Sequence, residues 1–567
     1  MKNKSLQLYI LLITFFHTYN ALAQSKISFS ESRKNKDYTT LIGSLDTLVR
    51  EKMAEYNILG VSIALVDDQN VVWVKGFGYT DNTKTQQVNE TTLFSTQSIS
   101  KTYTATAFLM EAEKGKYNLD DVIIKHYPSF TVHSRYGDGE AKKITFRHLL
   151  SHRSGLCHET PIGNNYDTVH CTFEEHIKSV ASSWLRFPVG KFYSYSNMGP
   201  DITAYILSKK AGISVEEYLK RNLLMPLGMT KSTYNQEEVY KSGNYAKGYF
   251  GNEEMEKTYI ADPAAGGLYS NPTEMAKFLS FQFNNWKINN KVVISPKLLN
   301  QMYTVQFKLD GQVAGYGLGV RLKPYHGVTL VHHAGGGYGY RAEQAWIPEA
   351  KIGVIVLTND GAGSTFTNEI YQKALLGMTK AKFGSLPVTN ALAINKPVVH
   401  LSNTYLKRLA GTYKTNRNIL EIVAVKNKLT AVSGTDTTFL IAHSNTDFST
   451  DGGDKFIFSL PKRGMPLHFI NVNQNNADFY IFNDSPNEKA GENKPSWNSL
   501  IGSYKGYNNR QEETIELFMK NGYLYCSDGG ATKVTEYKPG IFFTTDGDLI
   551  IKRGDMLYFG NRAFTKQ

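Results

Sequence analysis

Two short patterns each occur twice in the C-terminal part of the chain. Leu409–Lys414, LAGTYK, returns as Leu500–Lys505, LIGSYK, and Phe448–Gly452, FSTDG, returns as Phe543–Gly547, FTTDG. The sequence around both copies reads almost entirely as short strands separated by turn residues. A repeated strand-rich pattern of this kind predicts two related β modules. Each module is short, so the two are either separate small barrels or paired halves of one barrel.

At 567 residues the whole chain is too long for a single ordinary core. Its composition, 41% hydrophobic and 20% charged, is typical of a globular protein. We therefore expect a mixed helix-and-strand domain over 24–380, a linker over 381–400, one β module over 401–490 and a second over 495–567.

The first residues have the pattern of a secretory leader. Lys2 and Lys4 give a basic start, Leu8–Phe16 is apolar, and Ala21–Ala23 resembles a cleavage site. Cleavage would remove residues 1–23 and deliver the protein to the periplasm or the exterior. No later apolar run is long enough to span a bilayer, so we expect no stable membrane insertion.

Charge and cysteine usage exclude several classes of function. The net charge of +12 is dispersed along the chain, which argues against nucleic acid as a partner. No Cys/His group has zinc spacing, and we expect neither a metal nor a cofactor. A disulfide between Cys157 and Cys171 would close a short loop and add about 3 kcal/mol to stability. The sequence does not decide whether this disulfide forms. Cys526 lies in a strand-like segment and is expected to be a buried thiol.

Hydrophobic periodicity predicts helices and strands in the first domain. The expected helices are Leu41–Tyr56, Phe94–Met110, Thr145–Leu156 and Thr365–Leu376, and the expected strands are Gly60–Val66, Val71–Lys75, Gly327–His332, Arg341–Trp346 and Ile352–Thr358.

A candidate nucleophile lies in the second of these helices. Ser98 and Lys101 are three residues apart and share one helical face, which brings an amine next to a hydroxyl. A serine hydroxyl needs such a neighbour to take its proton, and Lys101 can do so if burial favours its neutral form. With Ser95 or Thr96 as the cap, Ser98 would lie in the first turn, where free backbone N–H groups favour negative charge. Taken alone, S-x-x-K is a weak motif, and an isolated serine there is most simply a capping residue.

The second candidate stretch is Tyr195-Ser196-Asn197, before a helix-like run. A tyrosine can shuttle a proton if nearby cations favour its phenolate, and an asparagine offers both a donor and an acceptor to a substrate amide. The same Y-x-N form occurs at Tyr507-Asn508-Asn509, where we assign it no role. The Y-x-N motif therefore indicates a function only when other motifs of the same site accompany it.

The third candidate stretch is Val331–Gly339, VHHAGGGYG. On a strand His332 and His333 point to opposite faces, so only one of them can enter a given cleft. We choose His333, because the glycines after it, Gly335 and Gly336, leave bare backbone beside which a substrate could lie as an added strand. His148 and His152, spaced by four residues, lack a third ligand or a nearby Glu and are interpreted as structural.

Together, in this order, the three stretches resemble the serine β-lactamase and penicillin-binding-protein superfamily. The Y-x-N form is similar to its class C and D-peptidase branch, because class A enzymes carry S-D-N. The segments LLSHRSGL, FYSYSNMG, PLGM, AAGGLYSN and YGLG resemble the same branch, and the resemblance covers roughly Leu41 to Thr379. The fold it implies is α/β (α+β): an antiparallel sheet flanked by helices, a helical subdomain, and the all-β C-terminal modules, which look like the lipocalin-like barrels of D-aminopeptidase relatives.

The resemblance also implies roles. Ser98 would be the acylated nucleophile, Lys101 its proton partner, and Tyr195 the general base and proton relay. Asn197 would hold the substrate amide, with His333 and Gly335 lining the site, and the backbone N–H groups of Ser98 and Gly336 would form the oxyanion hole.

One departure bears on the substrate. The third motif is H-A-G, where class C β-lactamases carry K-T-G, so the motif supplies no permanent cation for a substrate carboxylate. We therefore expect a hydrolase of D-amino-acid-containing peptides, of carboxypeptidase or aminopeptidase type, acting on a small peptide such as a cell-wall peptide. A carboxylesterase or weak β-lactamase using the same residues is the alternative within enzymes. A penicillin-binding sensor or scaffold without turnover is the alternative of another class. The sequence does not define the oligomeric state.

Overall fold

A computed structural model describes residues 36–164, 170–255, 261–308, 312, 314–385, 396–415, 419–434, 436–461, 467–472, 477–485, 491–508, 511–527 and 530–567. The leader pattern over 1–23 and part of the expected linker lie outside these residues. None of the described helices is both long enough and apolar enough to cross a membrane.

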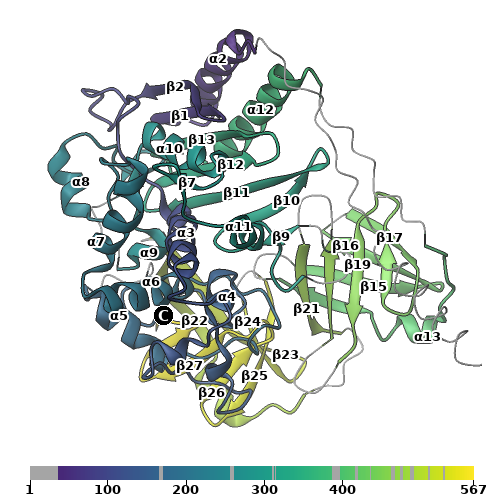
Figure 1. The fold of residues 1–567 in the computed structure, drawn as a ribbon. Helices are drawn as coiled ribbons and strands as arrows, with labels where there is room; N and C mark the ends of the chain where they lie inside the picture. Colours follow the sequence, from purple (N-terminus) through teal and green to yellow (C-terminus); the bar gives the residue numbers. More distant parts are fainter. Residues whose placement is uncertain are drawn as a thin grey trace, which may run out of the picture.

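A seven-stranded antiparallel sheet forms the centre of the first domain, in the order β2-β1-β13-β12-β11-β10-β9 (Figure 1). Its strands are β1 (Gly60–Asp67), β2 (Asn70–Gly78), β9 (Gly315–Tyr316), β10 (Arg321–Tyr325), β11 (Val328–Gly337), β12 (Tyr340–Ile347) and β13 (Ile352–Thr358). The flanking helices include α2 (Thr39–Glu55), α3 (Ser100–Glu113), α4 (Phe146–Leu150), α5 (Phe173–Ser179), α6 (Met198–Ala211), α7 (Val215–Leu219), α8 (Gln236–Ser242), α9 (Pro263–Gly266), α10 (Pro272–Phe283), α11 (Pro296–Met302) and α12 (Ser364–Phe383).

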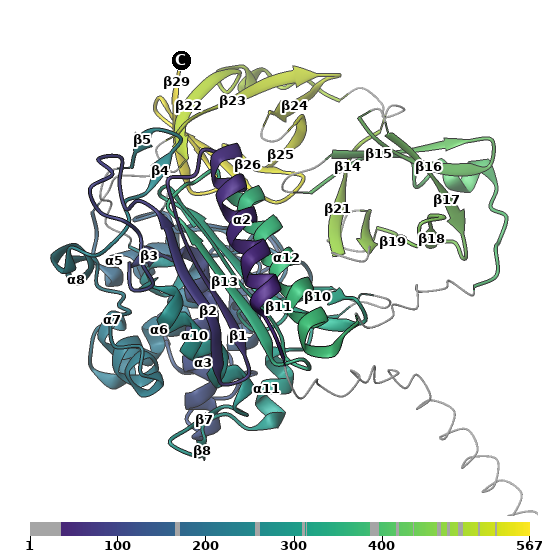
Figure 2. The same ribbon diagram turned by 90° about the horizontal axis from the view of Figure 1, so that it is seen from above.

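The sheet is covered on both faces, which explains why both faces of β1 carry buried apolar residues. Val61, Ile63 and Leu65 of β1 pack in the cluster under α2 and α12, whereas Ala64 and Val66 belong to the larger core on the other face. Figure 2 shows α2 and α12 side by side on one side of the sheet and the other helices beyond it. The predicted mixed fold is confirmed.

Three predicted helices are wrong in their boundaries. The helix expected over Thr365–Leu376 extends to Phe383 as α12. The predicted Phe94–Met110 helix is instead a short strand β3 (Phe94–Ser95), a 3-10 turn η1 (Gln97–Ile99) and then α3. The predicted Thr145–Leu156 helix ends at Leu150 as α4, because His152 adopts a left-handed backbone conformation, with φ of 58°, that cannot continue a helix.

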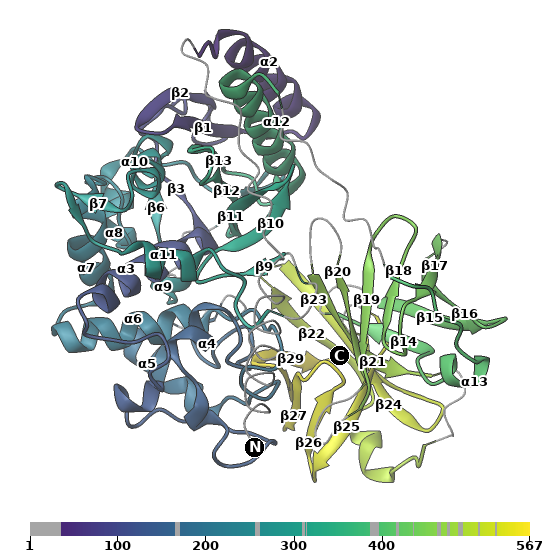
Figure 3. The same cartoon turned by 45° about the vertical axis from the view of Figure 1, so that its right-hand side comes forward.

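The C-terminal region forms two separate closed eight-stranded barrels, so the single-barrel alternative is excluded (Figure 3). The first contains β14 (Gly411–Lys414), β15 (Ile419–Val425), β16 (Lys428–Ser433), β17 (Asp436–Ala442), β18 (Asp447–Ser449), β19 (Lys455–Ser459), β20 (His468–Val472) and β21 (Ala477–Asp484), preceded by α13 (Asn403–Leu406). The second contains β22 (Gly502–Asn508), β23 (Gln511–Lys520), β24 (Tyr523–Cys526), β25 (Thr532–Lys538), β26 (Ile541–Thr544), β27 (Leu549–Arg553), β28 (Met556–Phe559) and β29 (Arg562–Lys566).

The repeated sequence pattern corresponds to a repeated contact. Tyr413 donates its hydroxyl to the carbonyl of Leu409 at 2.6 Å in the first barrel, and Tyr504 donates to that of Leu500 at 2.8 Å in the second. In both barrels the tyrosine ring is fully buried. The LAGTYK pattern therefore marks the same contact at the start of the first strand in each barrel.

The other repeated pattern, FSTDG in the first barrel and FTTDG in the second, lies in different surroundings in the two barrels. Asp451 of the first barrel is exposed, but its counterpart Asp546 is buried where three parts of the chain meet. The Asp546 carboxylate lies 3.8 Å from the guanidinium of Arg186, in the first domain, and 3.8 Å from the ammonium of Lys414, in the first barrel. Burial opposes its ionisation, but the charges of Lys414 and Arg186 outweigh burial and lower the pKa of Asp546.

We predict that Asp546→Asn lowers the free energy of unfolding by about 3 kcal/mol, because two buried cations lose their common anion. Asp451→Asn, at the exposed counterpart, should change it by less than about 0.5 kcal/mol. Urea titration of both variants measures the difference. Since the folded pKa of Asp546 is lowered, its contribution should disappear as the pH falls through that pKa. Equal effects of the two substitutions would contradict this role.

Candidate functional site

Ser98 lies on a tight turn between a strand and a helix. β3 pairs with β6 (Tyr269–Ser270), and the chain then turns through Gln97, whose φ of 50° is unusual for a residue with a side chain. The predicted capping by Ser95 or Thr96 is wrong: Thr96 donates its hydroxyl to the carbonyl of Leu268 at 2.9 Å. The turn leaves Ser98 partly exposed while its neighbours are buried.

Lys101 is brought to Ser98 as the three-residue spacing predicts. Its ammonium nitrogen lies 3.1 Å from Ser98 Oγ and donates to the carbonyl of Ala265 at 2.8 Å. The side chain is only 1% exposed. Among the described residues no carboxylate lies within ion-pair distance of this ammonium, so Ser98 and Ala265 are its hydrogen-bond partners.

A buried carboxylate fixes the carbonyl that holds Lys101. Asp201, on α6, accepts hydrogen bonds from the backbone N–H groups of Ala264 and Ala265, each at 3.1 Å. The imidazole of His176 lies 3.7 Å from the other Asp201 oxygen. Burial alone would lower the pKa of His176, but the adjacent Asp201 raises it, and burial raises the pKa of Asp201 as well. Asp201 stabilises the start of α9 through its hydrogen bonds to Ala264 and Ala265.

Tyr195 is surrounded by basic side chains. Its ring centroid lies 5.0 Å from the Lys101 ammonium and 5.9 Å from the Arg321 guanidinium. The rings of His152 and His333 lie 4.3 and 6.4 Å away, centroid to centroid. Tyr195 therefore lies beside the ammonium that contacts Ser98, which is the place that a general base requires.

In the described part of the chain, the side-chain amide of Asn197 is held by one hydrogen bond, and its oxygen accepts none. Its Nδ2 donates to Glu159 Oε1 at 2.8 Å, and its backbone N–H donates to the carbonyl of His158 at 2.8 Å. Its Oδ1 is buried and has no hydrogen-bond partner among the described residues. An orphaned buried acceptor costs free energy, and a substrate N–H would satisfy it.

The two histidines of β11 point to opposite faces, as the strand period predicts. His332 stacks on Tyr371 of α12, with ring centroids 6.3 Å apart, whereas His333 faces the site and contacts the hydroxyl of Tyr316 at 2.7 Å. Burial, with the nearby charges of Arg321 and Lys101, lowers the pKa of His333 well below its usual range. His333 is therefore neutral at physiological pH.

Gly335 and Gly336 bring the β11 backbone against the Ser98 turn. A Cβ atom on Gly335 would lie 2.0 Å from the carbonyl oxygen of Thr96, so no side chain fits there. On Gly336 it would lie 1.5 Å from the guanidinium of Arg341. β10 pairs only with Val328–His332 of β11 in the described chain, which leaves the stretch from His333 to Gly337 with an open edge on that side.

Sequence reasoning missed three residues of this site. Arg321 begins β10, and only the pairing of β10 with β11 brings it near Tyr195. Glu159 holds Asn197 from a loop without regular structure. His152, interpreted as structural, contacts Tyr195 directly, although its Nδ1 accepts from the backbone N–H of Ser196 at 3.1 Å, which is a supporting contact. His148 stacks on Phe307 and caps α4, in agreement with its structural interpretation.

The cysteines and the expected absence of a metal site can also be described. Cys157 and Cys171 are not joined by a disulfide, and burial raises the pKa of Cys157 to about 12. Cys526 is a fully buried thiol in β24, as predicted. No group of three or more His, Cys, Asp or Glu side chains suited to a metal ion occurs within the described ranges.

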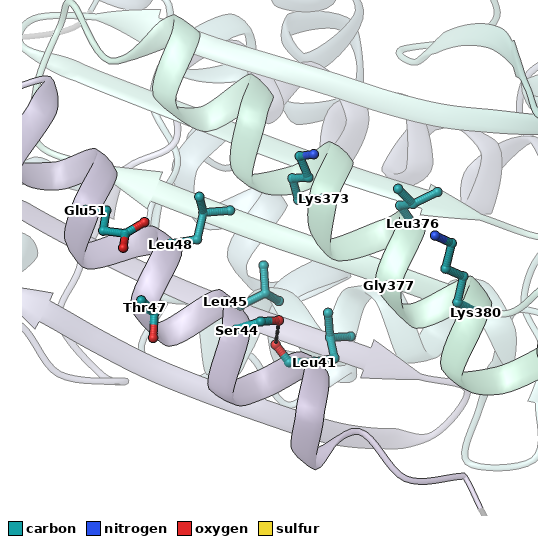
Figure 4. Close-up of a pocket in the computed structure, with 10 residues that line it drawn as sticks. All are labelled: Leu41, Ser44, Leu45, Thr47, Leu48, Glu51, Lys373, Leu376, Gly377 and Lys380. Carbon is teal, nitrogen blue, oxygen red and sulfur yellow. Dashed lines mark hydrogen bonds between the residues drawn. The ribbon is translucent and has the colours of Figure 1, made fainter.

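A cavity of about 560 Å³ lies away from these residues, in the groove between α2 and α12 (Figure 4). It is lined by Leu41, Ser44, Leu45, Thr47, Leu48, Glu51, Lys373, Leu376, Gly377 and Lys380. None of the three motif stretches contributes to its lining, so the groove belongs to the packing of two helices and not to the Ser98 site.

Comparison with known proteins agrees with this geometry. A family model described as Beta-lactamase matches residues 45–377. The chain belongs to the β-lactamase family. It is 27% identical over 322 residues to Beta-lactamase-like protein 2 of Dictyostelium discoideum, a match that covers 55% of this chain and 58% of that protein. It is also 27% identical over 248 residues to Protein flp of Staphylococcus aureus (strain COL), covering 42% of this chain and 48% of that protein.

Solved structures show the same fold. The octameric penicillin-binding protein homologue from Pyrococcus abyssi has a TM-score of 0.51 and 25% identity, covering 77% of this chain and 99% of that chain. A class C β-lactamase has a TM-score of 0.52 and 22% identity, and the match covers 60% of this chain and 98% of that chain. D-amino acid amidase from Ochrobactrum anthropi SV3, complexed with L-phenylalanine amide, has a TM-score of 0.51 and 21% identity, covering 60% and 99%. The chain spans about half the length of the curated relatives that it matches, and the solved structures show that its first domain has the β-lactamase fold.

We predict that Asp201→Ala slows labelling of Ser98 by a fluorophosphonate about tenfold or more, because the carbonyl that holds Lys101 loses its support. It should also lower the free energy of unfolding by about 2–4 kcal/mol, since two buried N–H groups lose their acceptor. Ser208→Ala, which removes a buried hydroxyl from the same helix, is the control and should cost stability without slowing labelling. Normal labelling of folded Asp201→Ala would contradict the assignment.

Proposed function

We propose that the protein is an exported hydrolase that forms an acyl-enzyme on Ser98 and cleaves amide or ester bonds, with D-amino-acid-containing peptides as its preferred substrates. The observation that carries the proposal is the Lys101 ammonium 3.1 Å from Ser98 Oγ beside the ring of Tyr195. Export is supported by the leader pattern alone, and the peptide substrate by the open edge of β11 and the orphaned amide oxygen of Asn197.

In the proposed reaction, Tyr195 acts in its deprotonated form and takes the proton of Ser98 as Oγ bonds to the substrate carbonyl carbon, while the Lys101 ammonium donates to Oγ. The backbone N–H groups of Ser98 and Gly336 stabilise the negative oxygen that forms. The C–N or C–O bond then breaks, and Tyr195 returns the proton to the leaving group. Water attacks the acyl carbon in a second step and loses a proton to Tyr195, which passes that proton to Ser98 Oγ as the acyl C–O bond breaks and the acid product leaves.

The peptide backbone has a natural place beside β11. From His333 to Gly337 this strand pairs with β12 alone in the described chain, so its other edge can accept an extended peptide through main-chain hydrogen bonds. Asn197 Oδ1 would accept from the amide N–H on the acyl side. A peptide can thus bind both the open edge of β11 and the Oδ1 atom of Asn197, whereas a simple ester of a small acid can bind neither.

Arg321 would supply the permanent cation that the H-A-G motif lacks. Its guanidinium lies 5.8 Å from the ring of Tyr316, whose hydroxyl contacts His333. Because His333 is neutral at physiological pH, Arg321 is the residue here that can bind a substrate carboxylate as an ion pair. This favours peptides with a free C-terminal carboxylate, the carboxypeptidase type.

We predict faster cleavage of an N-acylated peptide ending in D-Ala-D-Ala than of its all-L counterpart. Arg321→Gln should raise KM for the D-peptide about tenfold or more, because an ion pair is lost, and leave KM for the C-terminally amidated D-peptide nearly unchanged. Steady-state kinetics on the three peptides measure this.

The control is Lys323→Gln, which removes a cation from the same strand that donates to Tyr371, away from the site. It should leave all three substrates unaffected. Equal rates on D- and L-peptides, or equal losses on free and amidated peptides in Arg321→Gln, would refute the substrate assignment. Cleavage of p-nitrophenyl esters without any peptide cleavage would instead identify a carboxylesterase.

A further inference from the structure

The barrels act on the rest of the chain through their outer surfaces, because their own side chains fill their interiors. The first barrel is packed with aromatic rings in edge-on and tilted contact, among them Tyr413, Phe458 and Phe469. The core of the second includes Tyr504, Phe559 and Phe564. What either barrel contributes to the hydrolase is therefore to be sought where its loops contact the first domain.

One such loop is the turn between β28 and β29, with Asn561 at its tip. The Asn561 Nδ2 donates to the carbonyl of Glu159 at 2.6 Å and also lies 3.0 Å from Cys157 Sγ and 3.0 Å from Ser183 Oγ. In return, its own carbonyl accepts from Asn164 Nδ2 at 3.4 Å. One side chain of the second barrel thus ties together two segments of the hydrolase domain.

The segment that Asn561 holds forms one wall of the Ser98 site. His158 accepts from the backbone N–H of Asn197, and Glu159 accepts from the Asn197 side chain, each at 2.8 Å. The ring of His158 also lies 5.5 Å from that of Tyr195, centroid to centroid. The Glu159 residue therefore touches Asn561 with its main chain and Asn197 with its side chain.

The first barrel supports the same segment from another direction. Phe192, three residues before Tyr195, packs edge-on against Phe479 of β21 with ring centroids 4.3 Å apart, and against His468 of β20 at 5.3 Å. This contact is apolar and broad, whereas the Asn561 contact is directional. Hydrogen bonds fix orientation more closely than an apolar face does, so Asn561 is the stronger determinant of geometry.

We infer that Asn561 is a positioning residue for the active site: acting through Glu159, it sets the orientation of the Asn197 amide, so that the second barrel controls recognition of the substrate's acyl-side N–H. The inference rests on the proposed function of Asn197. It gives the second barrel a part in substrate selection without any barrel residue touching the substrate.

Two probes separate this role from general stabilisation. Benzylpenicillin carries an acylamino group that Asn197 can hold, whereas a small alkyl fluorophosphonate carries none. Asn561→Ala should slow acylation of Ser98 by benzylpenicillin about tenfold or more, the cost of losing one positioning hydrogen bond. Labelling by the fluorophosphonate should stay within about twofold of wild type, because the nucleophile itself is unchanged. Intact-protein mass spectrometry gives both rates.

Three further variants sharpen the test. Asn561→Asp keeps the shape but has no N–H to donate, and should behave like Asn561→Ala. Asn498→Ala changes an exposed asparagine in the turn that leads into the same barrel, and should behave like wild type. In the Asn197→Ala background, Asn561→Ala should cause no further loss with benzylpenicillin, because both substitutions remove the same interaction.

The outcomes distinguish the two proposals. A wild-type protein that neither probe labels would refute the proposed function of Ser98. Labelling by the fluorophosphonate alone would refute the role of Asn197 and this inference with it. If both rates fall together in Asn561→Ala, or if its effect adds to that of Asn197→Ala, the contact is structural and the inference is wrong.

Discussion

The site depends on a buried ammonium that lies within hydrogen-bond distance of a hydroxyl and donates to a carbonyl. Lys101 is 1% exposed, and in the described part of the chain no carboxylate pairs with it. Burying such a group costs free energy unless its hydrogen bonds are satisfied, so the fold must supply partners at fixed places. Ser98 is one partner and the carbonyl of Ala265 is the other. Asp201 in turn accepts from the backbone N–H of Ala265, so the position of Lys101 beside the nucleophile depends on a second buried polar group.

Parts of the chain that are distant in sequence must meet for this arrangement to work. The Ser98 turn contacts β11, where Gly335 permits the close approach, and the Tyr195 segment is supported from outside by both barrels. Asp546, Arg186 and Lys414 bring charges from the hydrolase domain and both barrels into one buried cluster. The barrels therefore belong to the same packed assembly as the active site and are not independent appendages.

Local sequence patterns predicted the features that depend on local geometry. The three-residue spacing placed Lys101 beside Ser98, and the two-residue period of a strand separated His333 from His332. The repeated LAGTYK pattern correctly indicated two β modules, because each copy lies at the start of its own barrel. The three motif stretches together predicted the mixed fold of the first domain.

The same patterns could not predict features that depend on strand register or on left-handed residues. Arg321 reaches Tyr195 only through the pairing of β10 with β11, and Asn561 reaches Glu159 only through docking of the second barrel. The helix expected over Ser98 begins later because Gln97 is left-handed, and nothing in its residue type indicates that. Long-range contacts decided these features, and a single sequence does not record them.

The most direct test of the account is peptide mapping by mass spectrometry after fluorophosphonate treatment of the wild-type protein, Ser98→Ala and Lys101→Ala. The account predicts one adduct on wild type, located on Ser98. It predicts none on Ser98→Ala and strongly slowed labelling of Lys101→Ala, with all three proteins folded by circular dichroism. An adduct that persists on folded Ser98→Ala, or wild-type labelling rates without Lys101, would contradict the central claim that Lys101 activates Ser98.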